Sequence, residues 1–134
     1  MPRDTYIQTI ERLNLQPELV AMHAEHEWRF EEVGYTAAMR AFDGKGFATR
    51  TVLCANDRLA TGVIAPAFQR GFKVGREPDC HLRIAGHDDQ PLSRYACPPL
   101  TTVAQDVNRL GAESLSLLLR RIKAQAGETP SRFA

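Results

Sequence analysis

The chain has 134 residues, with 17 Lys and Arg against 16 Asp and Glu, which gives a formal net charge of +1. This balance excludes the strongly basic surface that a stand-alone nucleic-acid-binding domain usually carries. The hydrophobic fraction of 43% and the charged fraction of 25% exclude an intrinsically disordered chain. A chain of this length suits one globular domain.

The sequence predicts a soluble, cytoplasmic protein with no membrane partner. No stretch approaches the roughly 18 to 20 consecutive apolar residues of a membrane span, and the first residues lack the apolar core of a signal peptide. The three cysteines, Cys54, Cys80 and Cys97, are odd in number and lack C-x-x-C spacing. We therefore expect reduced thiols rather than a disulfide framework or a zinc site.

Apolar spacing predicts the elements of the first half of the chain. A helix is expected from an N-cap at Asp4 to the Gln16-Pro17 pair, followed by a short buried strand at residues 19–22. A second helix is expected from Phe30 to about Ala41, ended by the glycine-rich residues 43–46.

A second buried strand is predicted at residues 51–55, and a helical stripe runs from Leu59 to Phe68, with Gly71 as its C′ residue. Pro66 lies inside this stripe, so it bends the helix unless the helix begins later. A third strand at residues 82–85, an extended segment at residues 98–103 and a last helix at about residues 107–122 complete the pattern.

Alternating helices and strands predict an α/β fold, a parallel sheet flanked by helices with right-handed crossovers. Three buried strands are few for a sheet that is covered on both faces. We therefore expect an incomplete lobe of a larger α/β unit.

Polar residues follow each predicted strand, where open parallel sheets bind ligands. They are His23, His26 and Trp28; Asn56 and Asp57; and His87, Asp88 and Asp89. An aromatic ring with amide and carboxylate groups suits a polyhydroxyl ligand, and Arg3 at the start of the first helix would add hydrogen-bond donors.

Structural roles for the same residues remain open. Asn56 or Asp57 would also serve as a helix N-cap, Asp88 and Asp89 could begin a turn, and Trp28 could be a core residue. Two chemical alternatives are weaker. His23 and His26 with Cys80 and His81 do not have a zinc spacing, and Asp88-Asp89 lacks a phosphate-binding glycine loop. No G-x-S-x-G nucleophile motif is present, so we predict no catalytic residue, no metal and no cofactor.

Four ordered blocks carry a family resemblance. They are Cys54-Ala55-Asn56-Asp57-Arg58-Leu59-Ala60-Thr61-Gly62, then Gly71-Phe72-Lys73-Val74-Gly75, then Ile84-Ala85-Gly86-His87-Asp88-Asp89, then Pro98-Pro99-Leu100-Thr101-Thr102-Val103 with Gln105-Asp106 and Leu110-Gly111. In this order they resemble the effector-binding domain of the lactose-repressor/galactose-repressor (LacI/GalR) family of bacterial transcription regulators. The resemblance implies a two-lobed, periplasmic-binding-protein-like (type I) fold that binds a small sugar-like effector and forms a homodimer.

The resemblance also implies a domain division. Residues 1–103 resemble the C-terminal lobe of the effector-binding domain without its first strand, residues 104–126 resemble a helix of the N-terminal lobe, and residues 127–134 form a polar tail. No helix-turn-helix is present, so operator DNA is expected to bind only through a domain outside this sequence.

By position, the resemblance implies effector contacts for four residues and structural roles for two. Arg3 would grip the effector, Trp28 would pack on it, and Asn56 and Asp88 would bind its hydroxyl groups. Asp57 and Asp89 resemble structural residues. Residues 77–80 form an insertion of about four residues relative to the family pattern, in a surface loop.

Two other functions compete with effector sensing. The first is a solute-binding protein of a sugar transporter, which has the same fold but needs an export signal. The second is an enzyme that uses Asp88 or Asp57 with a metal. We also expect the stripe at residues 59–68 and the last helix to expose apolar surface that favours self-association, with that stripe and the loop around Tyr95 as the contact.

Overall fold

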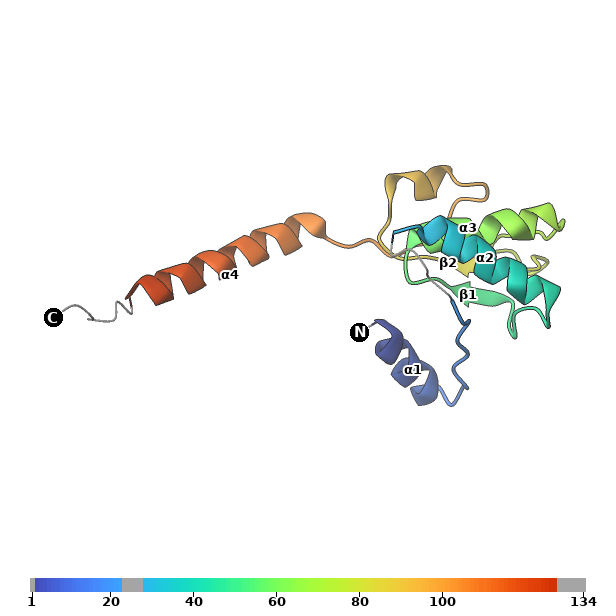
Figure 1. The fold of residues 1–134 in the computed structure, drawn as a ribbon, viewed down its shortest axis with the longest axis horizontal. Coiled ribbons are helices and arrows are strands. Elements are labelled where there is room, and N and C mark those ends of the chain that lie inside the picture. The colour runs from blue at the N-terminus through green and yellow to red at the C-terminus, as the bar shows by residue number, and fades with distance from the viewer. Residues whose placement is uncertain (1, 23–27, 128–134) are drawn as a thin grey trace. The chain divides into compact units, whose positions relative to one another are not determined.

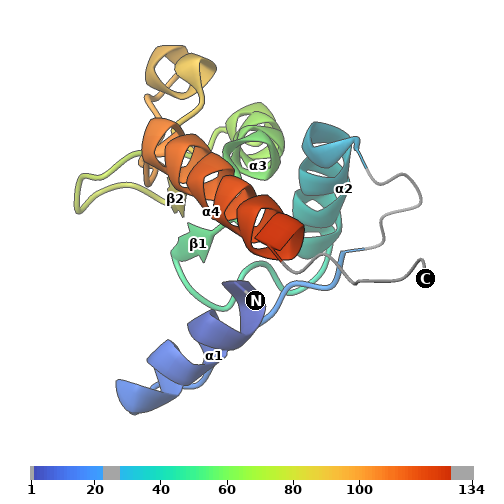
Figure 2. The ribbon, with the colours of Figure 1, turned by 90° about the vertical axis from the view of Figure 1, so that its left-hand side faces the viewer.

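A computed structural model describes residues 2–22 and 28–127 of the chain, and these residues form two compact units, Met1–Ala104 and Gln105–Ala134. The first unit contains a parallel pair of strands, β1 (Thr51–Leu53) and β2 (Arg83–Ala85). Helices α2 (Phe30–Asp43) and α3 (Asp57–Gln69) lie side by side next to these strands (Figures 1 and 2). The predicted parallel pairing of the strands at residues 51–55 and 82–85 is therefore present.

The extended segment after β2 adds backbone pairing on the other side of that strand. Along the chain, a 3-10 helix, η1 (Pro91–Tyr95), lies between β2 and this extended segment. Ala85 pairs with Thr101 and Asp88 pairs with Ala104 in isolated parallel bridges. The peptide bond between Cys97 and Pro98 is cis.

The helices α2 and α3 approach closely because glycine occupies their contact. A Cβ atom at Gly34 would lie 2.3 Å from the Leu59 carbonyl oxygen, and one at Gly62 would lie 2.2 Å from the Glu31 carbonyl oxygen. The core contains apolar side chains of α2, α3 and β2 and of the segments beside β2: Ala38, Leu59, Ala60, Val63, Ile64, Ala67, Leu82, Ile84 and Leu100.

The expectation of an exposed stripe on α3 is wrong. Leu59 and Val63 are buried because this face of α3 packs on α2 and β2, and only Phe68 at its end is exposed. Pro66 lies inside α3, which begins at Asp57, so the alternative of a helix that begins later in the chain is wrong. Gly71 is confirmed at the C-terminus with a φ of 72°, where its N–H donates to the Phe68 carbonyl, as in a Schellman motif.

Three other expectations are corrected. Residues 19–22 form no strand, and Leu19 and Met22 are about half exposed, because no backbone partner pairs with this run among the described residues. The strand β1 is not buried on both faces, since Leu53 is exposed. Helix α1 (Pro2–Arg12) begins at Pro2, so Asp4 lies in its first turn and is not its N-cap.

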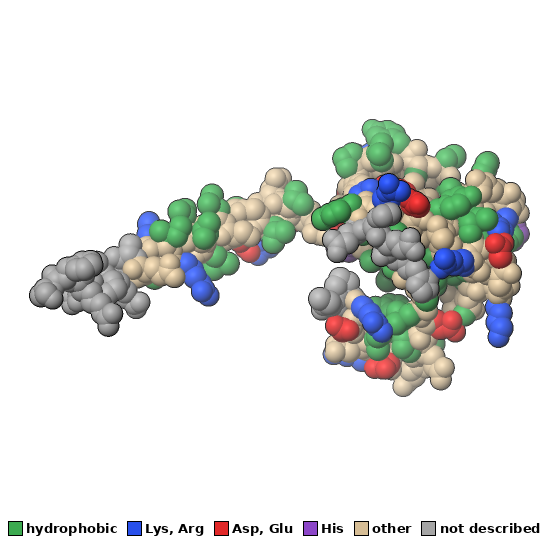
Figure 3. Space-filling model, viewed as in Figure 1, with side chains coloured by type: hydrophobic (Ala, Val, Ile, Leu, Met, Phe, Trp, Pro, Cys, Tyr) green, Lys and Arg blue, Asp and Glu red, His purple; other side chains and the backbone are tan. Residues whose placement is uncertain are grey.

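The second unit contains one helix, α4 (Val107–Gly127), and residues 128–134 of the expected polar tail lie outside the described part of the chain. Hydrophobic side chains are exposed along α4 (Figure 3): Val107, Leu110, Leu115, Leu117, Leu118, Leu119 and Ile122. Among the helices of residues 2–22 and 28–127, none combines the length and the hydropathy that a bilayer crossing requires.

Candidate functional site

The carboxyl ends of β1 and β2 lie at the same edge of the strand pair, because the strands are parallel and Leu53 is in register with Ala85. Backbone hydrogen bonds continue past the strands. The Asp57 N–H donates to the His87 carbonyl oxygen at 2.9 Å. Asn56 directly precedes Asp57 and Asp88 directly follows His87. The fold therefore brings these two predicted effector contacts together.

Asp57 is buried between the two segments, with 1% of its surface exposed. Its Oδ2 atom accepts hydrogen bonds from the Gln90 N–H at 2.8 Å and from the Ser93 hydroxyl at 2.6 Å, and its Oδ1 atom accepts from the Thr102 hydroxyl at 2.5 Å. These bonds join the first turn of α3 to η1 and to the extended segment after it. A buried carboxylate with three donors fixes the backbone around the site.

The sequence did not single out the three donors to Asp57. Thr102 lies within the block at residues 98–103 that carried the family resemblance, so its position was marked although its role was not. Gln90 and Ser93 belong to no pattern in the sequence, because η1 is an irregular turn that only the folded chain brings to Asp57.

Asn56 is the N-cap of α3. Its backbone is extended, and its Oδ1 atom accepts the Leu59 N–H at 2.8 Å. The capping alternative is therefore confirmed for Asn56, and α3 begins where the cap places it. The cap uses the side-chain oxygen and leaves the amide nitrogen of Asn56 as a donor that could meet a ligand.

Asp88 has a backbone conformation that L-residues rarely adopt, with a φ of 108°, and Asp89 follows in the left-handed region with a φ of 48°. Hydrogen bonds hold both residues: the Asp88 N–H donates to the Val103 carbonyl, and the Asp89 N–H donates to the Thr102 hydroxyl. The Asp88 carboxylate is about one third exposed and lies 3.0 Å from His87 Nδ1. Backbone strain of this kind concentrates at functional sites, where the surrounding structure enforces it.

Trp28 lies on the surface just before α2, with 75% of its surface exposed, so the core alternative for this residue is wrong. Its ring meets Phe30 edge to face at 6.2 Å between centroids. The guanidinium of Arg58 lies 5.3 Å from the Phe30 ring centroid. This series of contacts leads from Trp28 to the first turn of α3, two residues from Asn56.

Arg3 lies exposed in the first turn of α1, and no hydrogen bond between described residues joins it to Trp28, Asn56 or Asp88. His23 and His26 fall outside the described residues. Within residues 2–22 and 28–127, no three His, Cys, Asp or Glu side chains come together as a metal site would require.

Comparison with known proteins gives a consistent family. A family model described as a periplasmic binding protein-like domain matches residues 3–133. The HTH-type transcriptional repressor PurR of Haemophilus influenzae is 36% identical over 97 residues, which cover 72% of this chain and 27% of that protein. PurR of Histophilus somni is 39% identical over 77 residues, which cover 58% and 22% respectively. The chain thus spans about a quarter of the length of these curated relatives.

Similar solved structures agree with the relatives found by sequence. The lac repressor dimer bound to operator and the anti-inducer ONPF is similar with a TM-score of 0.74 and 28% identity, over 92% of this chain and 40% of that one. A regulatory protein of the LacI family from Chloroflexus aggregans has a TM-score of 0.70 and 27% identity, over 95% of this chain and 42% of that one. The lac repressor bound to ONPG has a TM-score of 0.75 and 28% identity, over 92% of this chain and 35% of that one. The predicted fold class and the resemblance to LacI-family regulators are confirmed.

Proposed function

Because the chain belongs to the family of periplasmic binding protein-like domains, we propose that it senses a small effector as part of a LacI-type transcription regulator. The observation that carries this proposal is the shared edge of β1 and β2, where Asn56 and Asp88 lie beside the hydrogen bond from Asp57 to His87. An amide donor and a carboxylate acceptor on a fixed backbone suit the hydroxyl groups of a sugar or sugar derivative.

We assign the contacts as follows. The Asp88 carboxylate accepts hydrogen bonds from ligand hydroxyl groups, the Asn56 amide donates to the ligand, and Trp28 offers an exposed ring face. Arg3 is the fourth proposed contact, from α1. Asp57 and Asp89 act by holding the two strand ends in place through the hydrogen bonds described above.

The remaining parts of the proposal come from the relatives. We propose a cytoplasmic regulator without catalytic activity that forms a homodimer, as the lac repressor does in its operator complex. Operator DNA would be bound by a helix-turn-helix outside this sequence. An effector acts in such a protein by binding one conformation more tightly than another.

The competing function as a solute-binding protein of a transporter uses the same fold. The relatives named above are repressors, which favours the regulator. The enzyme alternative requires a metal near Asp88 or Asp57. The three hydroxyl and N–H donors around Asp57 already occupy its oxygen atoms, which argues against it.

A thermal-shift screen of the chain with sugars, sugar acids, purine bases and ONPG tests the proposal, since a ligand stabilises the folded state that it binds. We expect one class to raise the melting temperature in a dose-dependent way and Asp88→Ala to remove that shift. The matched control is Glu11→Gln on α1, which also removes one negative charge and should keep the shift. A shift that persists in Asp88→Ala, or one produced only by divalent metals, contradicts the proposal.

A further inference from the structure

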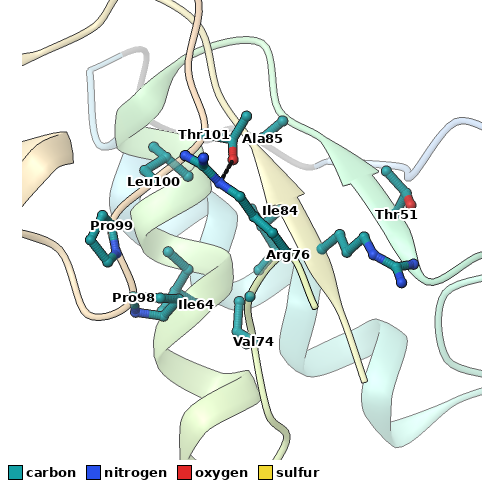
Figure 4. A pocket seen from close by; sticks show the side chains of 12 residues that line it. Thr51, Ile64, Val74, Arg76, Ile84, Ala85, Pro98, Pro99, Leu100 and Thr101 are labelled. Carbon is teal, nitrogen blue, oxygen red and sulfur yellow. Dashed lines mark hydrogen bonds between the residues drawn. The ribbon is translucent and has the colours of Figure 1, made fainter. Parts of the chain in front are cut away.

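A cavity of about 310 Å³ lies beside β2, and its lining includes none of the proposed effector contacts. One wall is apolar, formed by Ile64 of α3, Val74, Ile84 of β2 and Leu100. Figure 4 shows these side chains together with Pro98 and Pro99. This volume is at the lower end of the range for small-molecule sites.

Two arginines give the cavity its charge. Arg76 extends along β2, and its Nε atom donates to the Thr101 hydroxyl at 2.9 Å (Figure 4). The guanidinium of Arg83 donates to the Glu77 carbonyl oxygen at 3.4 Å. Each of these contacts uses one donor of a group that has five, so most donors of both guanidinium groups remain for a ligand.

No carboxylate of the described chain neutralises either arginine. The cavity lining contains no Asp or Glu, and no salt bridge involving Arg76 or Arg83 forms among residues 2–22 and 28–127. The nearest acidic side chain in sequence, Glu77, faces its own loop, where Oε2 accepts the Arg76 N–H at 3.1 Å and the Cys80 thiol at 3.4 Å. The cavity therefore has a positive potential above an apolar wall.

We propose that this cavity binds a small organic carboxylate, with the Arg76 guanidinium holding the carboxylate, Arg83 adding positive charge to the lining, and the apolar wall receiving an aromatic or aliphatic body. The guanidinium fork matches the geometry of a carboxylate, and a charge-assisted hydrogen bond gains strength beside an apolar surface. The chemistry differs from that of the effector site, where amide and carboxylate groups suit neutral hydroxyls.

Part of the cavity lining comes directly before the segment in which this sequence departs from the family pattern. Val74, Gly75 and Arg76 lead directly into the insertion at residues 77–80. In that loop the Lys73 ammonium pairs with Asp79 at 2.5 Å, and the Cys80 side chain is buried. The loop is thus internally held, and it presents Arg76 to the cavity rather than to its own acidic residues.

The test uses three probes that separate charge from shape. Benzoate carries both a carboxylate and a ring, benzamide has the same shape without the charge, and inorganic phosphate has the charge without the ring. Titration of the isotope-labelled chain, followed by amide NMR shifts, should show saturable binding of benzoate at Arg76, Ala85 and Thr101. Benzamide and phosphate should bind at least about tenfold more weakly, since each loses one of the two interactions.

Variants then assign the binding to the cavity. Arg76→Gln should weaken benzoate binding about tenfold, and Arg83→Gln should weaken it less, because it removes only a more distant charge. Arg121→Gln on α4 removes an exposed arginine outside the cavity lining and should leave binding unchanged. Ala85→Leu extends a side chain into the cavity and should abolish binding without any change of charge. The proposal is overturned if benzamide binds as tightly as benzoate, if Arg76→Gln binds benzoate like the unmodified chain, or if the shifts lie elsewhere.

Discussion

Gly86 lies against the carboxylate of Asp57: a Cβ atom at position 86 would be 2.3 Å from Asp57 Oδ1 and 3.1 Å from Leu100 Cδ2. The backbone of the segment after β2 therefore touches a buried acid, which in turn accepts three hydrogen bonds. This contact explains why glycine precedes His87 and Asp88 at the candidate site. The position of Asp88 therefore depends on the hydrogen bonds that the Asp57 carboxylate accepts from Gln90, Ser93 and Thr102.

Gly86→Ala should destabilise the first unit by roughly 2–3 kcal/mol, because the methyl group must displace either the Asp57 carboxylate or the backbone. Urea unfolding followed by circular dichroism measures the change. The control is Gly111→Ala in α4, where nothing lies within 4 Å of the added Cβ atom. There the same substitution should increase helix content, because alanine favours a helix by about 1 kcal/mol over glycine. Equal effects of the two substitutions would contradict this account.

Much of the fold follows from patterns that depend on neighbours in sequence. Apolar spacing located α2, α3 and α4, and Gly71 marked the end of α3 because its positive φ favours glycine. The run at residues 19–22 has the composition of a buried strand but no pairing partner among the described residues, and composition alone does not supply one. The burial of Leu59 could not be predicted from the sequence either, because it depends on the close approach of α2 and α3, in which Gly34 lies against the Leu59 backbone.

The candidate site was predictable to a similar extent. Parallel strands bring their carboxyl ends to one edge, so Asn56 and Asp88 could be placed together before the structure was known. The partners of Asp57 could not, because Ser93 and Gln90 reach it through an irregular turn.

The ion pair between Glu31 of α2 and Arg58 of α3 should make stability depend on pH. Two hydrogen bonds, of 2.6 and 2.7 Å, join the side chains, and the Arg58 guanidinium holds the pKa of Glu31 below its ordinary value of 4.5. The ionised form therefore stabilises the folded chain above about pH 4.5, and this contribution is lost as the pH falls through the lower pKa of the folded state. Since the Glu31 side chain is 47% exposed, solvent screening limits the effect to about 0.5 kcal/mol.

Glu31→Gln measures this contribution. The difference in unfolding free energy between Glu31→Gln and the unmodified chain should be present at pH 7 and decrease as the pH falls below about 4.5 and through the lower pKa of the folded state. Glu32→Gln is the matched control, because Glu32 pairs with Arg29 within the same helix and both side chains are more than 60% exposed. A constant difference across this pH range would show that the pair between α2 and α3 does not act through ionisation.

The three cysteines should differ strongly in reactivity. Burial raises the pKa of the Cys54 thiol to about 12, so at pH 8 only about one thiol in ten thousand is a thiolate. Cys80 is also buried, whereas Cys97 is exposed. With an aromatic disulfide reagent at pH 8, one thiol should react fast in the folded chain and all three in urea. Cys97→Ser should remove the fast phase and Cys54→Ser should keep it. A fast phase that survives in Cys97→Ser would place the exposed thiol elsewhere.

Asn56 combines two roles that one substitution can separate. Its Oδ1 atom caps α3 through the Leu59 N–H, while its amide nitrogen is the proposed donor to the effector. Asn56→Ala removes both groups and should cost about 1 kcal/mol of stability, the usual loss for a helix cap. Asn56→Asp keeps an oxygen acceptor for the cap, so its melting temperature should stay close to that of the unmodified chain. It lacks the donor, so binding of whichever sugar stabilises the chain in the thermal-shift screen should weaken about tenfold. If Asn56→Asp binds that sugar normally, Asn56 serves only as a cap and the effector contact at this strand end must come from Asp88.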